Sequence, residues 1–284
     1  MGTTDTTGMA EFSIDLLLQT PTVAVWDACC PGNGQHEPGE ECAAATHLVF
    51  PYRGLFVRHR QDDIAVAEAG QVLLSNANEE YRFSHPVPGG DASLILRIEE
   101  SMLRELVPST LIQDGAAVAF LPQRLRIDPR AQVLVALLRH SLRESIAESL
   151  EAESLALTLA QRSLGPRTAH VAGASTGRQR LVDRAKLVLA SDLSRRWSLA
   201  DIAVEVGVSA VYLTQVFQLV EGLPLYRYQL RLRLARALDL LGEYEDLSAL
   251  SHDLGFSSHS HFSAAFAQAY GRSPTEFRQS ALHR

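Results

Sequence analysis

An apolar stripe at helical spacing occurs twice in the last third of the chain. The first copy covers residues 199–206, continues through a Gly-Val-Ser turn at 207–209, and is followed by a second stripe that ends at Gly222. The same order returns over residues 247–271, displaced by 48 positions up to the turn and by 49 after it. Two amphipathic helices joined by a tight turn are typical of a helix-turn-helix unit, so the pattern predicts two such units.

The preceding part of the chain has other periods. Short apolar or alternating runs over residues 22–98 are separated by Gly, Pro, Asn and Asp, which predicts many short strands in a β-sandwich or small barrel. After residue 99, apolar residues such as Leu134, Leu138 and Leu142 recur at steps of three and four and predict an amphipathic helical pair. The leucine face of this pair either packs on the β-domain or forms a dimer seam, and periodicity alone leaves both open.

These changes of pattern predict an α+β multidomain fold in four parts. We expect a β-domain over residues 1–128, a helical segment over 129–164, a linker rich in Gly, Ala, Ser and Thr over 165–177, and an all-α domain over 178–284. A chain of 284 residues is long enough for two hydrophobic cores. The organisation therefore predicts that two activities are housed in separate domains.

The charge is divided unevenly between the two halves. Residues 178–284 contain 13 Arg and Lys and 11 Asp and Glu. Residues 1–177 contain 13 Arg and Lys and 22 Asp and Glu, and the net charge of the whole chain is −7. The helical domain is thus mildly basic and the β-domain acidic, which indicates a division of labour. No apolar run reaches membrane-spanning length and no signal peptide is evident, so we expect a cytoplasmic protein associated with the nucleoid and no membrane partner.

The second helix of each predicted unit has a short polar face that suits DNA. Glutamine can contact adenine through two hydrogen bonds, serine and threonine donate or accept, and apolar groups touch the thymine methyl group. The candidate base-reading residues are Val211, Thr214, Gln215 and Gln218 in the first unit and His259, Ser260 and Ser263 in the second. On the connecting helix, Arg227 and Arg231 are candidates for phosphate contacts, which position a protein without specifying sequence.

The repeat resembles the DNA-binding domain of the AraC/XylS family of bacterial transcriptional regulators. The matching residues are Ile202-Ala203, Gly207-Val208-Ser209, Tyr212-Leu213, Phe217 and Gly222, then Gly255-Phe256-Ser257-Ser258, Ser260-His261-Phe262-Ser263, Ala265-Phe266, Gly271, Ser273-Pro274 and Phe277-Arg278. The resemblance implies double-stranded promoter DNA as a partner, activation or repression of transcription, contact with RNA polymerase, a homodimer and no enzymatic activity. Where the family often has Arg or Lys, this chain has Gln215, Gln218, Ala264, Ala267 and Gln268. We therefore expect modest affinity of the monomer, with dimerisation supplying the rest.

The same resemblance implies that the N-terminal part is a cupin-like β-barrel that binds a small effector, followed by a helical dimerisation segment. Tyr81 stands where a cupin would have a metal-binding histidine, and a His-x-His pair is missing, so we expect no enzyme-type cupin metal centre. A barrel lined by side chains can hold one small ligand. The candidate lining residues are Trp26, His47, Tyr52, Phe56, Arg58, Tyr81 and Phe83.

A cluster of soft ligands occupies the segment after the first predicted strand. Cys29, Cys30, His36 and Cys42 lie within fourteen residues, and four such side chains can hold zinc, although the spacing is not a standard zinc-finger spacing. The same thiols could instead sense oxidants, or the cysteines could pack as small apolar residues. An odd number of cysteines does not make a secreted disulfide framework.

The sequence as a whole predicts a DNA-binding transcriptional regulator whose N-terminal domain senses a small effector. Two alternatives remain open at this stage. One is a metal- or thiol-responsive regulator that uses Cys29, Cys30 and Cys42, and the other is a regulator controlled by a partner protein without a small ligand. A cupin-type enzyme is disfavoured because its metal ligands are missing, and no other catalytic constellation is evident.

Overall fold

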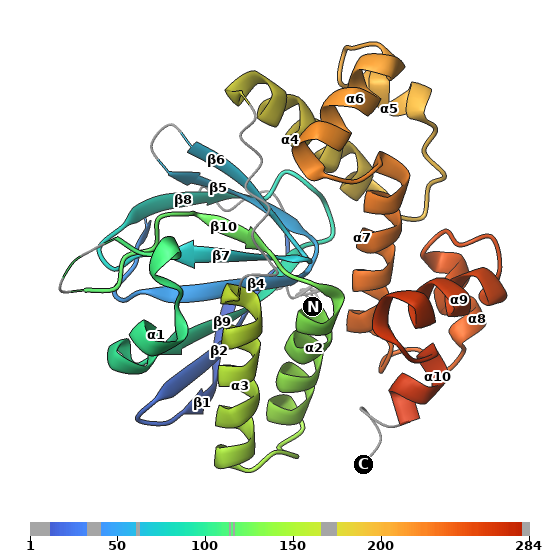
Figure 1. The fold of residues 1–284 in the computed structure, drawn as a ribbon. Coiled ribbons are helices and arrows are strands. Elements are labelled where there is room, and N and C mark those ends of the chain that lie inside the picture. The colour runs from blue at the N-terminus through green and yellow to red at the C-terminus, as the bar shows by residue number, and fades with distance from the viewer. Residues whose placement is uncertain are drawn as a thin grey trace, which may run out of the picture.

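The N-terminal part of the computed structural model consists of two antiparallel sheets (Figure 1). The structure describes residues 12–32, 41–60, 63–113, 115, 117–165 and 175–279. The larger sheet has the strand order β1 (Ser13–Gln19), β2 (Val23–Cys30), β9 (Asp91–Ile98), β4 (His47–Arg53), β7 (Gln71–Ser75) and β10 (Arg124–Arg126). The smaller sheet has the order β3 (Glu41–Cys42), β8 (Glu80–Ser84), β5 (Leu55–Arg60) and β6 (Asp63–Glu68).

The predicted β-rich domain is confirmed, but a closed barrel is not found. Within the described ranges, strand pairing occurs inside each sheet and no pairing joins one sheet to the other. The cupin-like barrel therefore stays a prediction. The predicted strands over 22–98 are present, and β1 and β10 are additional strands that pair with β2 and β7.

Three helices cover the larger sheet: α1 (Glu100–Leu106), α2 (Pro129–Arg143) and α3 (Ser149–Leu164) (Figure 1). Helix α2 begins with Pro129 after Asp128, whose side chain accepts a hydrogen bond from the Ala131 amide, and this is a favourable helix start. Small residues such as Ala152 and Ala156 let α3 pack closely in the core of the β-domain.

The leucine face of α2 is covered within the chain. Leu134 and Leu142 pack against the core of the β-domain, whereas Val133 and Leu137 pack against the last core of the helical domain. Helix α2 therefore lies between the two domains. Packing within the chain is thus the arrangement found for these side chains, and the dimer seam and the homodimer stay predictions.

The C-terminal part is helical throughout its described residues after 175. It contains α4 (Thr176–Ser191), α5 (Leu199–Glu205), α6 (Ala210–Glu221), α7 (Leu225–Leu240), α8 (Leu247–Asp253), α9 (His259–Tyr270) and α10 (Pro274–Phe277). The long helix α7 contributes Tyr228 and Leu232 to one core, with α4 to α6, and Leu234 and Leu238 to a second core, with α8 to α10. It thereby links two helical lobes (Figure 1). Among the described helices none is individually long and apolar enough to cross a membrane, and only the bent pair α5 and α6 meets the length and composition requirement together.

Candidate nucleic-acid interface and ligand pocket

The first helix pair, α5 and α6, has the geometry of a helix-turn-helix motif. Ser198 and Asp201 form a reciprocal capping box at the start of α5, and Ser209 caps α6. Gly207 in the turn has φ 72°, a left-handed conformation that favours glycine. The axes of α5 and α6 differ by 89°, close to the lower end of the range for DNA-binding pairs.

The second helix pair, α8 and α9, repeats this arrangement with one difference in the turn. Asp246 caps α8, Ser258 caps α9, and Gly255 in the turn has φ 75°. A Cβ atom at Gly255 would lie 2.2 Å from the backbone oxygen of Ser194, whereas a Cβ atom at Gly207 would meet no atom within 4 Å. The second turn is thus packed against the first lobe, and the first turn is open.

Both second helices bury their apolar faces and expose most of the predicted reading residues. In α6, Leu213 and Phe217 are fully buried, and in α9, Phe262 and Phe266 are fully buried. The exposed residues are Val211, Thr214, Gln215 and Gln218 on α6 and His259 and Ser260 on α9, while Ser263 is half-buried. The described structure places no hydrogen bond on the Gln215 or Gln218 side chain, but the Ser263 hydroxyl lies 3.2 Å from Nε2 of His259. The outward face of α6 therefore has the more available polar groups.

The arginines of α7 divide into two groups. Arg227 and Arg231 are exposed and line a cavity of 880 Å³ together with residues of the β-domain such as Gly70 and Arg126, so they face the boundary between the two domains. Arg233 instead donates hydrogen bonds to the carbonyls of Leu193, Arg195 and Gly255. It thereby ties the first lobe to the turn of the second pair. Phosphate contacts by Arg227 and Arg231 stay a prediction.

A buried ionic cluster joins the first helix pair to the β-domain. Lys186 on α4 lies with its Nζ 3.1 Å from Oε1 of Glu68 on β6 and 2.8 Å from Oε1 of Glu221, the last residue of α6. Arg126 on β10 pairs with the same Glu221 side chain and also donates to its backbone carbonyl. The side chains of Lys186, Glu68 and Glu221 are at most 4% exposed. The end of α6 is thus held by both domains.

The electrostatics of this cluster keep Lys186 and Glu221 charged. Burial opposes the charge on Lys186, but Glu68 and Glu221 outweigh it and raise its pKa. Burial likewise opposes ionisation of Glu221, yet Lys186 and Arg126 lower its pKa. Glu68 differs, because burial prevails over the attraction of Lys186 and raises its pKa to about 7. Glu68 is therefore the member of the cluster that takes up a proton first as the pH falls.

A second ionic contact joins α7 to the N-terminal part. The buried carboxylate of Asp239 lies 2.9 Å from Nε of Arg53 on β4 and 2.8 Å from an Nη of Arg139 on α2, and Arg236 completes the group. Near it, the Tyr270 hydroxyl at the end of α9 donates to Gln132 on α2 at 3.3 Å. The second pair thus meets α2 through these polar contacts and through Val133 and Leu137.

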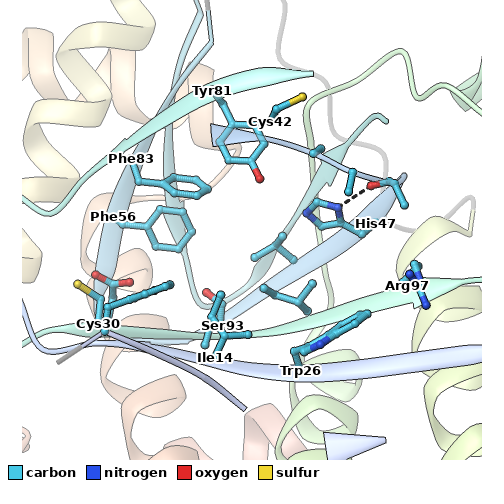
Figure 2. A pocket seen from close by; sticks show the side chains of 18 of the residues that line it. Ile14, Trp26, Cys30, Cys42, His47, Phe56, Tyr81, Phe83, Ser93 and Arg97 are labelled. Atoms are coloured by element: carbon cyan, nitrogen blue, oxygen red, sulfur yellow. Dashed lines mark hydrogen bonds between the residues drawn. The ribbon is translucent and has the colours of Figure 1, made fainter. Parts of the chain in front are cut away.

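The β-domain contains a mostly apolar pocket of 410 Å³ between its two sheets (Figure 2). This volume lies within the range of small-molecule sites. Five of the predicted lining residues do line it: Trp26, His47, Phe56, Tyr81 and Phe83. Arg97 and His47 also line the pocket. The guanidinium of Arg97 lies 5.3 Å from the centre of the Trp26 ring, and burial lowers the pKa of His47. A ligand would meet aromatic walls and a cation near one end.

The remaining two predicted lining residues point elsewhere. The Tyr52 hydroxyl donates to Asp27 at 2.6 Å, and Arg58 is 1% exposed and donates to the carbonyls of Leu74 and Gln123. Tyr52 is on the opposite face of β4 from the pocket residues His47 and Val49, whereas Arg58 is on the same face of β5 as Phe56 but is held by these carbonyls outside the pocket. The sequence analysis missed Ser93, Ile95 and Arg97 on β9, although their spacing of two residues places them on one face of a strand.

The predicted cysteine cluster is not assembled as one site by the described residues. Cys29 and Cys30 are consecutive in β2 and so point to opposite faces: Cys29 lies 3.7 Å from the Tyr52 hydroxyl, while Cys30 lines the pocket. Cys42 is exposed on β3, and His36 lies outside the described residues. Burial raises the pKa of the Cys30 thiol, which disfavours the reactive thiolate that a redox sensor needs.

Comparison with known proteins identifies the class of the C-terminal domain. A family model described as a helix-turn-helix domain matches residues 202–280, which contain the second helix pair and all of the first except the first three residues of α5. The probable transcriptional regulator LumQ of Photobacterium leiognathi is 30% identical over 161 residues, and the transcriptional activator RhaR of Klebsiella pneumoniae is 34% identical over 136 residues. These alignments cover 54% and 48% of this chain. Over residues 202–280 the chain is therefore similar to the helix-turn-helix domains of transcriptional regulators, as the sequence predicts.

The similarity is confined to part of each relative. The chain covers 61% of the length of LumQ and 47% of that of RhaR, and these relatives are named as regulators and not as enzymes. Among solved structures, an AraC-type regulator from Chromobacterium violaceum is 30% identical over 38% of this chain, with a TM-score of 0.36. ToxT of Vibrio cholerae bound to an unsaturated fatty acid aligns with 95% of the chain at 13% identity and a TM-score of 0.36. Scores of this size do not establish a shared fold for the whole chain.

Proposed function

We propose that this protein is a transcriptional regulator that reads promoter DNA with α6 and α9 and responds to a small ligand in the β-domain. The observation that carries the proposal is the pair of helix-turn-helix arrangements, each with a buried apolar face and an exposed polar face. The match of residues 202–280 to a helix-turn-helix family model and the similarity to transcriptional regulators support it. The protein would act in the cytoplasm on the nucleoid, as a homodimer that works with RNA polymerase.

The two reading helices differ in what they offer to base edges. Gln215 and Gln218 on α6 suit adenine, and Val211 suits the methyl group of thymine. His259 and Ser260 near the start of α9 offer fewer bidentate contacts. If both helices face one side of the duplex, they enter successive major grooves about 34 Å apart. In this proposal residues 1–128 sense the ligand, residues 129–164 form the helical segment, residues 165–177 link the domains, and residues 178–284 bind DNA.

A route from the ligand pocket to the DNA-binding domain is short. Phe56 lines the pocket from β5, and Leu55 beside it pairs in register with Glu68 on β6. Glu68 contacts Lys186, which in turn contacts Glu221 at the end of α6. A ligand that shifts β5 and β6 would therefore act on α6 through one strand and one ionic cluster. A ligand changes the equilibrium only if it binds the two arrangements with different affinity.

The experiment is selection of DNA from a random pool by the full-length protein, followed by gel-shift titration of the selected sequence. We expect specific binding that is weakened at least tenfold in the double variant Gln215→Ala/Gln218→Ala, while Arg184→Ala, an exposed change on α4, binds as the wild type does. Because the outward faces of α6 and α9 carry no Arg or Lys, affinity should fall only gently with salt. Failure to select any sequence, or equal binding by the double variant, would contradict the proposal.

The effector is tested separately on the same protein. Trp26 lies in the pocket, so ligands from a library of small, largely apolar acids should change its fluorescence. Ile95→Trp narrows the pocket and should abolish this response while leaving DNA binding intact in the absence of ligand. A ligand that binds the wild type and leaves DNA affinity and transcription unchanged would refute the coupling.

A further inference from the structure

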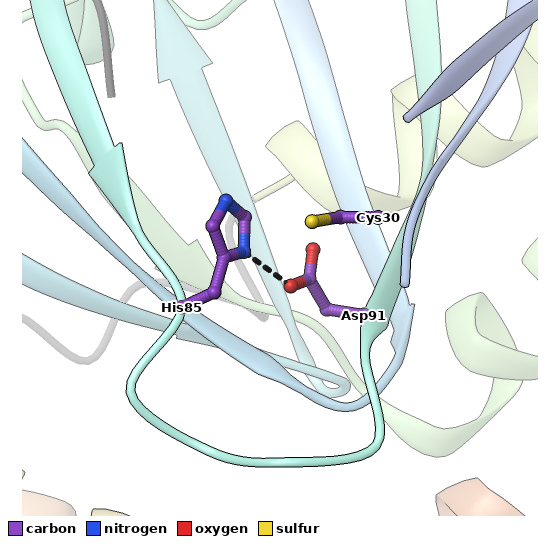
Figure 3. Close-up of side chains that lie close together, drawn as sticks. All are labelled: Cys30, His85 and Asp91. Atoms are coloured by element: carbon purple, nitrogen blue, oxygen red, sulfur yellow. Dashed lines mark hydrogen bonds and ion pairs between the residues drawn. The ribbon is translucent and has the colours of Figure 1, made fainter. Parts of the chain in front are cut away.

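We propose that Cys30, His85 and Asp91 form a binding site for one divalent ion of the zinc class, open to the pocket of the β-domain. The three side chains lie close together (Figure 3), and all three line the pocket. The proposal is independent of DNA binding, and it replaces the predicted set of Cys29, Cys30, His36 and Cys42 with a different one that retains only Cys30.

Backbone geometry brings the three ligands together. Cys30 is the last residue of β2 and Asp91 the first of β9, and the two are paired in register, so their side chains lie on the same face. His85 directly follows β8, and its Nδ1 lies 2.5 Å from Oδ2 of Asp91. One atom from each of the three side chains lies within 4.8 Å of the others.

The loop that carries His85 to Asp91 is held closely against β2. Gly90 has φ 75°, and a Cβ atom there would lie 2.4 Å from the carbonyl oxygen of Cys30. Only glycine fits at this approach, so the loop and the end of β2 are fixed relative to each other. The ligands are also largely buried: Cys30 is 8% exposed, Asp91 is 7% exposed, and the His85 side chain is 14% exposed.

The donor set indicates which ion would bind. A thiolate, an imidazole and a carboxylate are the ligands that zinc accepts, and a thiolate disfavours magnesium and calcium. Zinc bonds of about 2.0–2.3 Å in a tetrahedron place ligand atoms about 3.3–3.8 Å apart, so the observed cluster needs only a small adjustment of side chains. Binding requires the Cys30 thiol to lose its proton.

Three protein ligands leave a fourth position, and that position faces the pocket. Cys30, His85 and Asp91 all line the same cavity as Phe56 and Phe83. A site with three protein ligands and one open position is the arrangement in which zinc binds a further small molecule. A pocket ligand with a carboxylate or other oxygen donor would therefore complete the coordination, and an ion here would select for such a ligand.

The test is metal binding by the full-length, tag-free protein after removal of metals with a chelator. Titration calorimetry with zinc should give one site per chain, and cobalt should give the intense thiolate-to-metal absorption of a cysteine-ligated tetrahedral ion. Cys30→Ser, His85→Gln and Asp91→Asn should each weaken zinc binding at least tenfold, since each removes one ligand. Cys29→Ser, one residue away on the opposite face, and His36→Ala should bind zinc as the wild type does.

Folding is monitored in the same samples. Zinc should raise the melting temperature of the wild type and of Cys29→Ser but not of His85→Gln, which keeps a polar side chain of similar size at this position. The proposal is overturned if the wild type binds no zinc, or if a folded His85→Gln or Asp91→Asn variant binds it with unchanged affinity. It is also overturned if Cys29→Ser or His36→Ala abolishes binding while Cys30→Ser retains it.

Discussion

The two helix pairs of the C-terminal domain have almost the same sequence pattern but are attached to the rest of the molecule in different ways. The first pair ends in Glu221, which is buried in an ionic cluster with Lys186 and Arg126. The second pair meets α2 through apolar side chains and through the bond from Tyr270 to Gln132. The repeat therefore sets the local geometry of both pairs, while contacts outside the repeat determine how each pair is attached to the N-terminal part.

The turns of the two pairs also differ in their contacts with the rest of the domain. A Cβ atom at Gly207 would meet open space, whereas Gly255 is packed against the backbone of Ser194 and accepts a hydrogen bond from Arg233. The second turn thus connects the two lobes, and the first turn does not. Each difference can be tested by a matched pair of substitutions.

The largest effect is expected from removing the charge at the centre of the cluster. Lys186→Met leaves Glu68 and Glu221 buried without their shared partner, and breaking a buried pair in this way costs about 3–5 kcal/mol. Urea denaturation would measure the loss, with Arg184→Met on the exposed face of the same helix as the control, where we expect less than about 0.5 kcal/mol. A loss below about 1 kcal/mol for Lys186→Met would contradict a structural role for the cluster.

The two turn glycines give the next effect. Gly207→Ala places an alanine in a left-handed conformation, which costs about 1 kcal/mol of stability. No further cost is expected, because nothing obstructs its Cβ atom. Gly255→Ala adds a clash with the Ser194 backbone and should cost about 2–4 kcal/mol in total. Thermal and urea unfolding of the two variants would compare them directly. Equal losses would show that the second turn is not a joint between the lobes.

A smaller and more specific effect is expected on DNA affinity. Gln215→Ala should weaken binding to the selected site by about 1–3 kcal/mol, the value of one good bidentate contact. Ser263→Ala should cost less than about 1 kcal/mol, because its hydroxyl is half-buried and already lies against His259. Gel-shift titrations at one salt concentration would measure both variants. A larger loss for Ser263→Ala would reverse the proposed order of the two reading helices.

The last effect concerns the dependence of stability on pH. The pKa of Glu68 is raised to about 7 in the folded protein, above the ordinary value of 4.5, so the folded state takes up this proton before the unfolded chain does. Protonation of Glu68 therefore increases the free energy of unfolding as the pH falls through about 7, and this increase is fully present below pH 4.5, the ordinary pKa of the group. Relative to Glu68→Gln, the wild type should gain stability between about pH 8 and 5 in urea unfolding. A difference between the two proteins that does not change with pH would show that Glu68 is ionised throughout this range.

Features set by nearby residues were predictable from the sequence. The capping serines Ser198 and Ser209, the turn glycines and the buried phenylalanines of α9 all follow from spacing within one helix pair. Five pocket residues were found because aromatic side chains in short strands tend to face the interior. Ser93, Ile95 and Arg97 alternate along β9 and so share one face of the strand, but no local pattern indicated that this face lines the pocket.

Features that join distant residues were not predictable in this way. Lys186 and Glu68 are 118 positions apart, and Arg126 and Glu221 are 95 apart, so no local pattern links them. The choice of ligands at Cys30 likewise depends on the register of β2 and β9 and on a loop that brings His85 beside them. The adjacent cysteines suggested a joint site, but alternation along a strand separates Cys29 from Cys30.

The most direct test of the account is a hydroxyl-radical footprint of the full-length protein on its selected DNA. We predict two protected segments on one face of the duplex, about one helical turn apart, one for each reading helix. Gln215→Ala/Gln218→Ala should remove protection of one segment, and His259→Ala/Ser260→Ala should remove protection of the other. A single protected segment that both double variants weaken equally would contradict the claim that the two helix pairs read separate grooves.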